Sequence, residues 1–215
     1  MITMTETLEQ WQYFPSPVYS IEKPEFLTDV LAASNDVLRQ VRKEKKPNDI
    51  YPVTMGGFNN EPRITPFWDY TINTGWNILR DQGYLMEGLE TYFTEFWCQQ
   101  HDKYSSMEYH LHGDCKLVAF YFLECPKDPP RLVIHDPRPG KVMTPLREAD
   151  VNVVSPASSA INFTAKPGTL MFANAWLPHS FTRNSSVKPF KFIHMNIDTR
   201  ARDVQVCHPP TAEII

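Results

Sequence analysis

The spacing of apolar residues changes near residue 106 of the chain. Before it, apolar positions recur mostly at intervals of three and four, which is typical of amphipathic helices. After it, apolar and aromatic residues cluster in short runs that suit β-strands. We therefore expect one domain over 1–215, with a helical N-terminal layer (1–106), a jelly-roll metal-binding core (107–200) and a tail (201–215).

Three segments of the N-terminal half are predicted to be helical. The first, 24–46, places its apolar residues on one stripe between two prolines. The second, 66–82, has Thr65 as its expected cap, Pro66 at its first position and Gly83 as its stop. The segment "LMEGLETYFTEFWCQQHDK" is expected to form another packed helix.

The second half contains six strand-like segments separated by proline-rich turns such as "CPKDPP" and "DPRPGK". Many short strands at near-regular intervals favour a β-sandwich or jelly roll over alternating strands and helices. The six segments are "MEYHLH", "KLVAFYFLE", "RLVIHD", "AINFTA", "TLMFANA" and "FKFIHMNI".

Composition narrows the classes of protein that fit. The formal net charge of −4 makes duplex nucleic acid and anionic membranes poor partners. The four cysteines lack CxxC spacing and the N-terminus lacks a basic segment followed by an apolar core, so we expect a reducing, cytoplasmic setting. No apolar run approaches the length of a membrane span.

The segment "YHLHGDC" carries three potential metal ligands, His110, His112 and Asp114, at two-residue intervals. On a strand all three face one side, but positions four apart are separated by about 13 Å. One ion can therefore use only an adjacent pair, completed by a distal residue. His179 in "LPHSF" is the candidate, and two histidines with one carboxylate is the arrangement of non-haem iron(II) oxygenases.

The ordered set "EYHLHG", "KLVAFYFLECP", "RLVIHDPRPG", "KPGTLMFANAWLPHSF" and "PFKFIHMNI" resembles the 2-oxoglutarate- and iron(II)-dependent oxygenases of the double-stranded β-helix superfamily, particularly a group of small bacterial and bacteriophage proteins. The likeness covers about 107–197 and is weaker in "QYFPSPVYS". It implies a double-stranded β-helix with N-terminal helices, Fe(II) as cofactor and 2-oxoglutarate as co-substrate. The implied activity is a dioxygenase that hydroxylates a protein side chain or a small metabolite and releases succinate and CO2.

The resemblance supports two ligand sets. The wider superfamily's HxD motif maps onto His112 and Asp114, whereas the narrower group's HxH maps onto His110 and His112; His179 belongs to both. In the second mapping another acid such as Asp136 could complete the set. Physical reasoning favours Asp114, because three neutral histidines leave the charge of a divalent ion uncompensated.

Family members hold the far carboxylate of 2-oxoglutarate with a basic residue, often some ten positions after the distal histidine. Lys191, Lys188 and Arg138 are the candidates here. Arg138 could instead pair with Asp136 to brace its turn. His194 shares a strand face with two phenylalanines and is expected to be a satisfied core histidine.

A rival interpretation is a non-enzymatic jelly-roll binding or structural module, phage-related in origin, that keeps the fold without the chemistry. A cupin-like metal enzyme that does not use 2-oxoglutarate would need the same ligands. The sequence does not identify the substrate or the oligomeric state, and it is compatible with a homo-oligomer.

Overall fold

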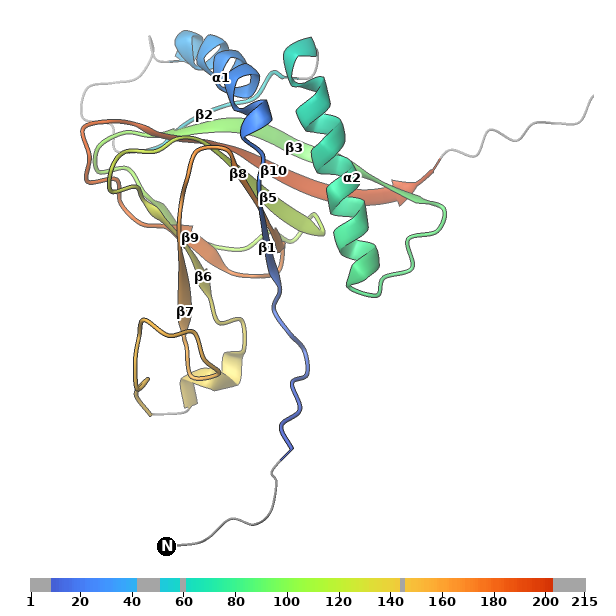
Figure 1. Ribbon diagram of the computed structural model, residues 1–215, viewed down its shortest axis with the longest axis vertical. Helices are drawn as coiled ribbons and strands as arrows, with labels where there is room; N and C mark the ends of the chain where they lie inside the picture. The colour runs from blue at the N-terminus through green and yellow to red at the C-terminus, as the bar shows by residue number, and fades with distance from the viewer. Residues whose placement is uncertain (1–8, 42–50, 59–60, 144–145, 203–215) are drawn as a thin grey trace, which may run out of the picture.

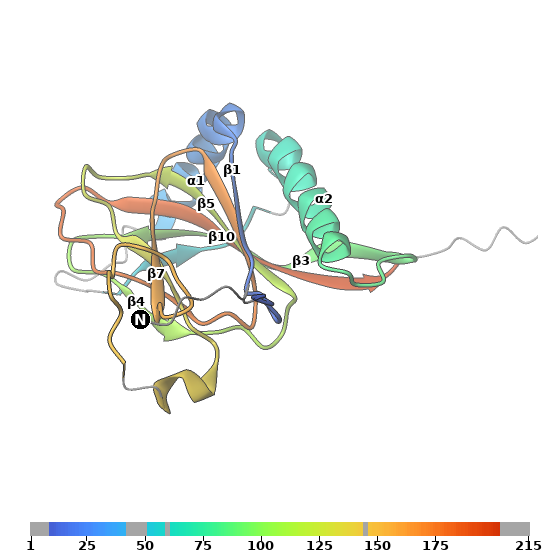
Figure 2. The ribbon, with the colours of Figure 1, turned by 60° about the horizontal axis from the view of Figure 1, so that its bottom comes forward.

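The computed structural model describes residues 9–41, 51–58, 61–143 and 146–202 as two packed β-sheets with two helices on one side. Figure 1 shows α1 (Leu27–Val41) and α2 (Thr65–Asp81) over the larger sheet. Figure 2 shows the same two helices on that side after the view is turned. The predicted class, a mainly β jelly roll with N-terminal helices, is confirmed.

The larger sheet has six strands in the order β1-β8-β5-β10-β3-β2, and the smaller has four in the order β4-β9-β6-β7. All the described strand pairs are antiparallel. The larger sheet consists of β1 (Val18–Glu22), β2 (Val53–Met55), β3 (Leu89–His101), β5 (Leu117–Glu124), β8 (Thr169–Asn174) and β10 (Phe190–Ala201). The smaller consists of β4 (Met107–His110), β6 (Arg131–His135), β7 (Ala160–Thr164) and β9 (His179–Phe181). Three short 3-10 helices are η1 (Pro24–Phe26), η2 (Pro62–Ile64) and η3 (Pro139–Met143).

Strand β5 lies between two apolar cores because its side chains alternate between the two faces of the larger sheet. Leu117, Ala119 and Tyr121 face the core beneath the helices. Phe120 and Phe122 face the second core, between the two sheets. This double burial explains why "KLVAFYFLE" is almost continuously apolar instead of alternating.

Helix α2 begins and ends close to the predicted boundaries. Thr65 is its first helical residue, and Ile64 occupies the cap position, so the expected threonine cap was wrong by one residue. Gly83 adopts a φ of +94°, and its N–H donates to the Arg80 carbonyl after the helix ends. The glycine stop is confirmed, since this left-handed conformation favours a residue without Cβ.

The helix predicted over "LMEGLETYFTEFWCQQHDK" was wrong, because this segment forms β3. Its register against β10 shifts between Asn196 and Ile197, so that Thr94 has no register partner on β10. This bulge places Phe93 and Phe96 on the same core. A spacing of three within a strand therefore imitated helical periodicity. The residues are also rich in threonine and aromatic side chains, which suit a strand.

The six segments predicted as strands in the second half form β4 to β8 and β10. The prediction missed β1, β2 and the three-residue β9. The proposed helix end at 42–47 and the tail at 203–215 lie outside the described residues, as do Cys207 and His208. None of the described helices is long and apolar enough to cross a membrane.

Candidate metal centre

Three histidines from two neighbouring strand ends meet in the structure. His110 is the last residue of β4 and pairs in register with His179, the first residue of β9. His112 follows β4, where its N–H donates to the Ala175 carbonyl. One ring nitrogen from each histidine lies within 4.8 Å of the other two. An ion bonded at about 2.1 Å needs separations of at most about 4.2 Å, so small ring rotations complete the set.

Hydrogen bonds orient two of these rings toward a common point. His110 Nδ1 lies 2.7 Å from the Glu108 carbonyl, and His179 Nδ1 lies 3.0 Å from the Leu177 carbonyl. A carbonyl only accepts, so in each pair Nδ1 carries the proton and the Nε2 lone pair is free. His179 Nε2 is buried and has no hydrogen-bond partner among the described residues. Both histidines therefore have the tautomer that a metal ligand needs.

The third ring, that of His112, is contacted by a side chain of the larger sheet. The Asn196 side-chain amide on β10 lies 3.3 Å from His112 Nδ1, and it donates to Glu95 Oε2 at 2.6 Å. His112 Nε2 is buried and also lacks a partner among the described residues. Asn196 and Glu95 thus link β10 and β3 to the histidine cluster. Sequence reasoning missed both, because their relation to His112 depends on strand pairing.

Asp114 belongs to a second group of potential metal ligands that shares His112 with the first. A carboxylate oxygen of Asp114, a ring nitrogen of His112 and the Cys115 sulfur lie within 4.8 Å of one another. His179 is not part of this second group. Burial raises the pKa of Cys115 to about 12, so this thiol stays protonated at neutral pH. The strand expected to carry all three ligands ends at His110, so the face shared by His110, His112 and Asp114 is not formed.

Burial disfavours protonation of two of the clustered histidines, His179 and His112. His179 is fully buried, and this burial lowers its pKa to about 4. Burial is also the largest cause of a lowered pKa at His112, with His110 acting in the same direction and Asp114 against it. The neutral imidazole that binds a metal is therefore the stable form of His179 and His112 at pH 7.

Lys191 lies on the opposite face of β10 from the histidines. It shares the helix-facing side with Ile193, whereas Phe192 faces the core between the sheets. Its ammonium group donates to Asn35 on α1 at 3.0 Å and pairs with Glu124 on β5. Lys191 therefore joins the helical layer to the sheet, and this geometry argues against a contact with a ligand of the cluster.

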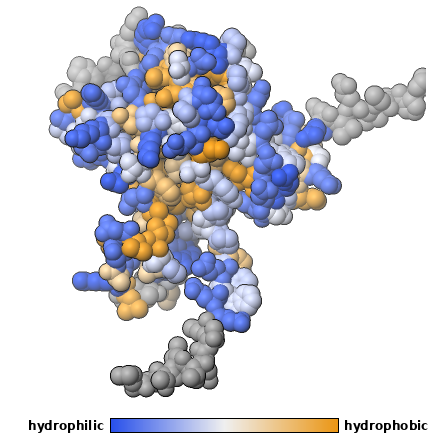
Figure 3. Space-filling view, viewed as in Figure 1, coloured by the Kyte–Doolittle hydropathy of each residue, from blue (hydrophilic) through white to orange (hydrophobic). Residues whose placement is uncertain are grey.

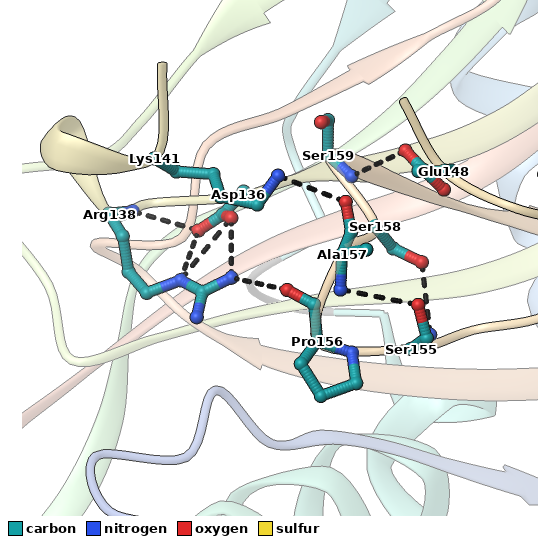
Figure 4. A network of polar contacts seen from close by, with 9 residues as sticks. All are labelled: Asp136, Arg138, Lys141, Glu148, Ser155, Pro156, Ala157, Ser158 and Ser159. Atoms are coloured by element: carbon teal, nitrogen blue, oxygen red, sulfur yellow. Dashed lines mark hydrogen bonds and ion pairs between the residues drawn. The ribbon is translucent and has the colours of Figure 1, made fainter. Parts of the chain in front are cut away.

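Arg138 braces the loop between β6 and β7, as Figure 4 shows. Its guanidinium pairs with Asp136 at 2.7 Å and donates to the Pro156 carbonyl at 3.2 Å. Hydrogen bonding from Arg138 lowers the pKa of Asp136. The expected pairing of the two residues is confirmed. Lys188, the remaining candidate cation, is exposed.

A model of the family described as "Putative 2OG-Fe(II) oxygenase" matches residues 95–189, the stretch that contains all three clustered histidines. The resemblance to the 2OG-Fe(II) oxygenases is confirmed. The matched stretch runs from within β3 to the residue before β10, so it includes β4 and β9, which carry His110 and His179. No curated protein matches the sequence.

Solved structures share this fold at low sequence identity. AviO1 from Streptomyces viridochromogenes has a TM-score of 0.57 and 12% identity, with 91% of this chain and 92% of that chain covered. A prolyl-4-hydroxylase from Pseudomonas putida has a TM-score of 0.52 and 12% identity, covering 87% and 94%. HygX from Streptomyces hygroscopicus, with nickel and 2-oxoglutarate bound, has a TM-score of 0.50 and 10% identity, covering 85% and 83%.

Proposed function

We propose that this protein is an Fe(II)- and 2-oxoglutarate-dependent oxygenase whose iron is held by His110, His112 and His179. The observation that carries the proposal is the convergence of three ring nitrogens, two of them buried and without partners among the described residues. Imidazole nitrogen is a suitable ligand for a borderline divalent ion such as Fe(II). The residues present therefore fit the metal that the family uses.

The donor set also favours an anionic co-substrate. Three neutral imidazoles leave two positive charges on a divalent ion in surroundings of low dielectric, and a dicarboxylate offsets them. HygX, which shares the fold, has 2-oxoglutarate bound. When bound, Fe(II) with 2-oxoglutarate supplies oxidative chemistry that couples oxidation of a substrate to release of succinate and CO2. The chain's own residues would hold the ion and orient the imidazoles, and burial favours the neutral forms of His112 and His179.

Asp114 is the alternative third ligand in place of His110, and its carboxylate would compensate part of the ion's charge. The register pairing of His110 with His179 supports the histidine set. Because Asp114 is grouped with His112 and Cys115, its negative charge would act on the ion from beside the three histidines, without a bond to the metal. The two sets share His112 and differ in the residue beside it.

We infer that the substrate is a protein side chain or a small metabolite, and that hydroxylation is the reaction. Five apolar side chains are exposed on the β6–β7 loop: Met143, Leu146, Val151, Val153 and Val154. Figure 3 shows apolar residues gathered in this lower part of the molecule. The loop starts after His135, whose ring contacts Tyr109 and whose Nε2 lies 2.9 Å from Ser180 Oγ. An exposed apolar loop that begins close to the cluster suits such substrates better than a polyanion.

The test is conversion of 2-oxoglutarate to succinate by the iron-loaded protein, which 2-oxoglutarate oxygenases perform slowly even without their substrate. We expect turnover in the wild type and its loss in His179→Ala. His101→Gln is the matched control, since it removes a buried histidine that lies 3.0 Å from Gln99 and outside the cluster. Absence of both turnover and iron binding in the wild type would contradict the proposal.

A further inference from the structure

His194 is a fourth histidine beside the metal centre. It lies on β10 and is only 3% exposed. The sequence predicted a satisfied core histidine, but its Nε2 is buried with no hydrogen-bond partner among the described residues. Buried polar atoms are normally paired, so an Nε2 without a protein partner next to a ligand site can form a hydrogen bond with a molecule that binds there.

Aromatic rings fix His194 in place on two sides. Its ring centroid lies 4.2 Å from that of Trp97 and 4.9 Å from that of Phe120. On the remaining side it lies 5.2 Å from the His112 ring and 6.4 Å from the His179 ring. The imidazole is therefore held between an apolar wall and the metal ligands. A hydrogen bond made in such water-poor surroundings is stronger than one made in water.

His194 is not a member of the convergent ligand set, which consists of His110, His112 and His179. Its proximity to two of these rings puts it within reach of a molecule that binds the ion. The uncompensated charge of a divalent ion on three neutral imidazoles favours an anionic molecule at this position. A carboxylate accepts hydrogen bonds strongly from a neutral N–H donor.

We propose that His194 is a ligand-binding residue whose Nε2–H donates to the carboxylate of the oxo-acid that completes the metal site. The inference rests on the proposed function and extends it, because it names the group that recognises the co-substrate's carboxylate. It also fits the placement of Lys191 on the opposite face of β10 and of Arg138 in an ion pair with Asp136. The contact supplies specificity for a carboxylate without a buried positive side chain.

The experiment measures binding in two steps by calorimetry, first Mn(II) as a redox-inert substitute for iron and then 2-oxoglutarate to the Mn(II)-loaded protein. His194→Gln puts an amide N–H near the position of Nε2, whereas His194→Asn puts it near Nδ1. His194→Leu removes the donor. His101→Gln again controls for loss of a buried histidine, and thermal unfolding establishes that each variant is folded.

We expect every variant to bind Mn(II) within about threefold of the wild type. The Kd for 2-oxoglutarate should rise roughly tenfold or more in His194→Asn and His194→Leu, as for loss of a hydrogen bond to a charged group. It should stay close to the wild-type value in His194→Gln and His101→Gln. The Gln and Asn variants are similar in polarity and size, so their difference remains informative if His194→Leu fails to fold.

Unchanged 2-oxoglutarate affinity in His194→Asn would overturn the inference while leaving the proposed function intact. Loss of Mn(II) binding in the His194 variants would also overturn it, because His194 would then be a metal ligand. Failure of the Mn(II)-loaded wild type to bind 2-oxoglutarate would instead overturn the proposed function, and the inference with it.

Discussion

His110 and His179 are register partners on the antiparallel strands β4 and β9, and their ring centroids lie 4.4 Å apart. Backbone hydrogen bonds between the strands set this pairing, so the two imidazoles are brought together before any ion binds. A site assembled in this way loses little side-chain freedom on binding a metal.

The register pairing leads to a prediction about the two competing ligands. His110→Ala should weaken Mn(II) binding by about a hundredfold or more, because it removes one of three ligands. Asp114→Ala should change the Kd by only a fewfold, since its charge acts from beside the site. Calorimetric titration of the two variants makes the comparison, with Glu108→Ala as an exposed control on β4. The reverse order of effects would identify Asp114 as the ligand.

Asn196 is predicted to be a positioning residue for His112. Asn196→Ala removes the amide that lies between Glu95 and His112 Nδ1. Groups that orient a metal-binding histidine typically contribute 10- to 100-fold in metal affinity, so the Mn(II) Kd should rise by about this factor. Asn196→Gln should not restore it, because the longer side chain displaces the amide. Unaltered affinity in both variants would show that His112 is oriented without Asn196.

The metal-free protein should lose stability as the pH falls from about 6.5 toward 4. Burial holds the pKa of His179 at about 4 in the folded state, below its ordinary value of 6.5. Between these values the unfolded chain binds more protons, so acid favours unfolding. His179 alone should cost about 2 kcal/mol at pH 5 relative to pH 7.5. Denaturant unfolding at the two pH values measures the loss, which should be smaller in His179→Gln. An equal loss in that variant would contradict the assignment.

Lys191 is predicted to stabilise the fold and not to bind the co-substrate. Lys191→Met keeps the apolar stem but removes the charge that pairs with Glu124 and bonds Asn35. Because Glu124 is partly exposed, the loss should be about 1 to 3 kcal/mol, below the cost of breaking a fully buried pair. The 2-oxoglutarate Kd should remain within about twofold. A large rise in this Kd with unchanged unfolding free energy would restore Lys191 as the anchor.

Six strands of the second half, β4 to β8 and β10, were predictable because each has a compact apolar run between strong turn signals. β3 was not, since the bulge at Thr94 gives its aromatic residues a helix-like spacing. β9 was missed because three residues are too few for a recognisable pattern. Local sequence thus identifies strands that form a compact apolar run between turns, and long-range pairing decides the others.

The residues of the candidate site also differ in whether local sequence or long-range strand pairing reveals them. His112 and His179 could be predicted from the sequence as candidate ligands, because their motifs are local. The relation of His110 to His179 depends on a strand register that the sequence does not state. Neither the Asn196 amide beside His112 nor the unpaired Nε2 of His194 has a local signal, since both arise where β10 passes the ends of β4 and β9.

The central claim is that three histidines hold the metal, and the most direct test is the structure of the iron-loaded protein under anaerobic conditions. We predict the Nε2 atoms of His110, His112 and His179 at about 2.0 to 2.2 Å from the ion. An oxygen of Asp114 in the place of His110 Nε2, or an ion bound outside this set, would contradict it.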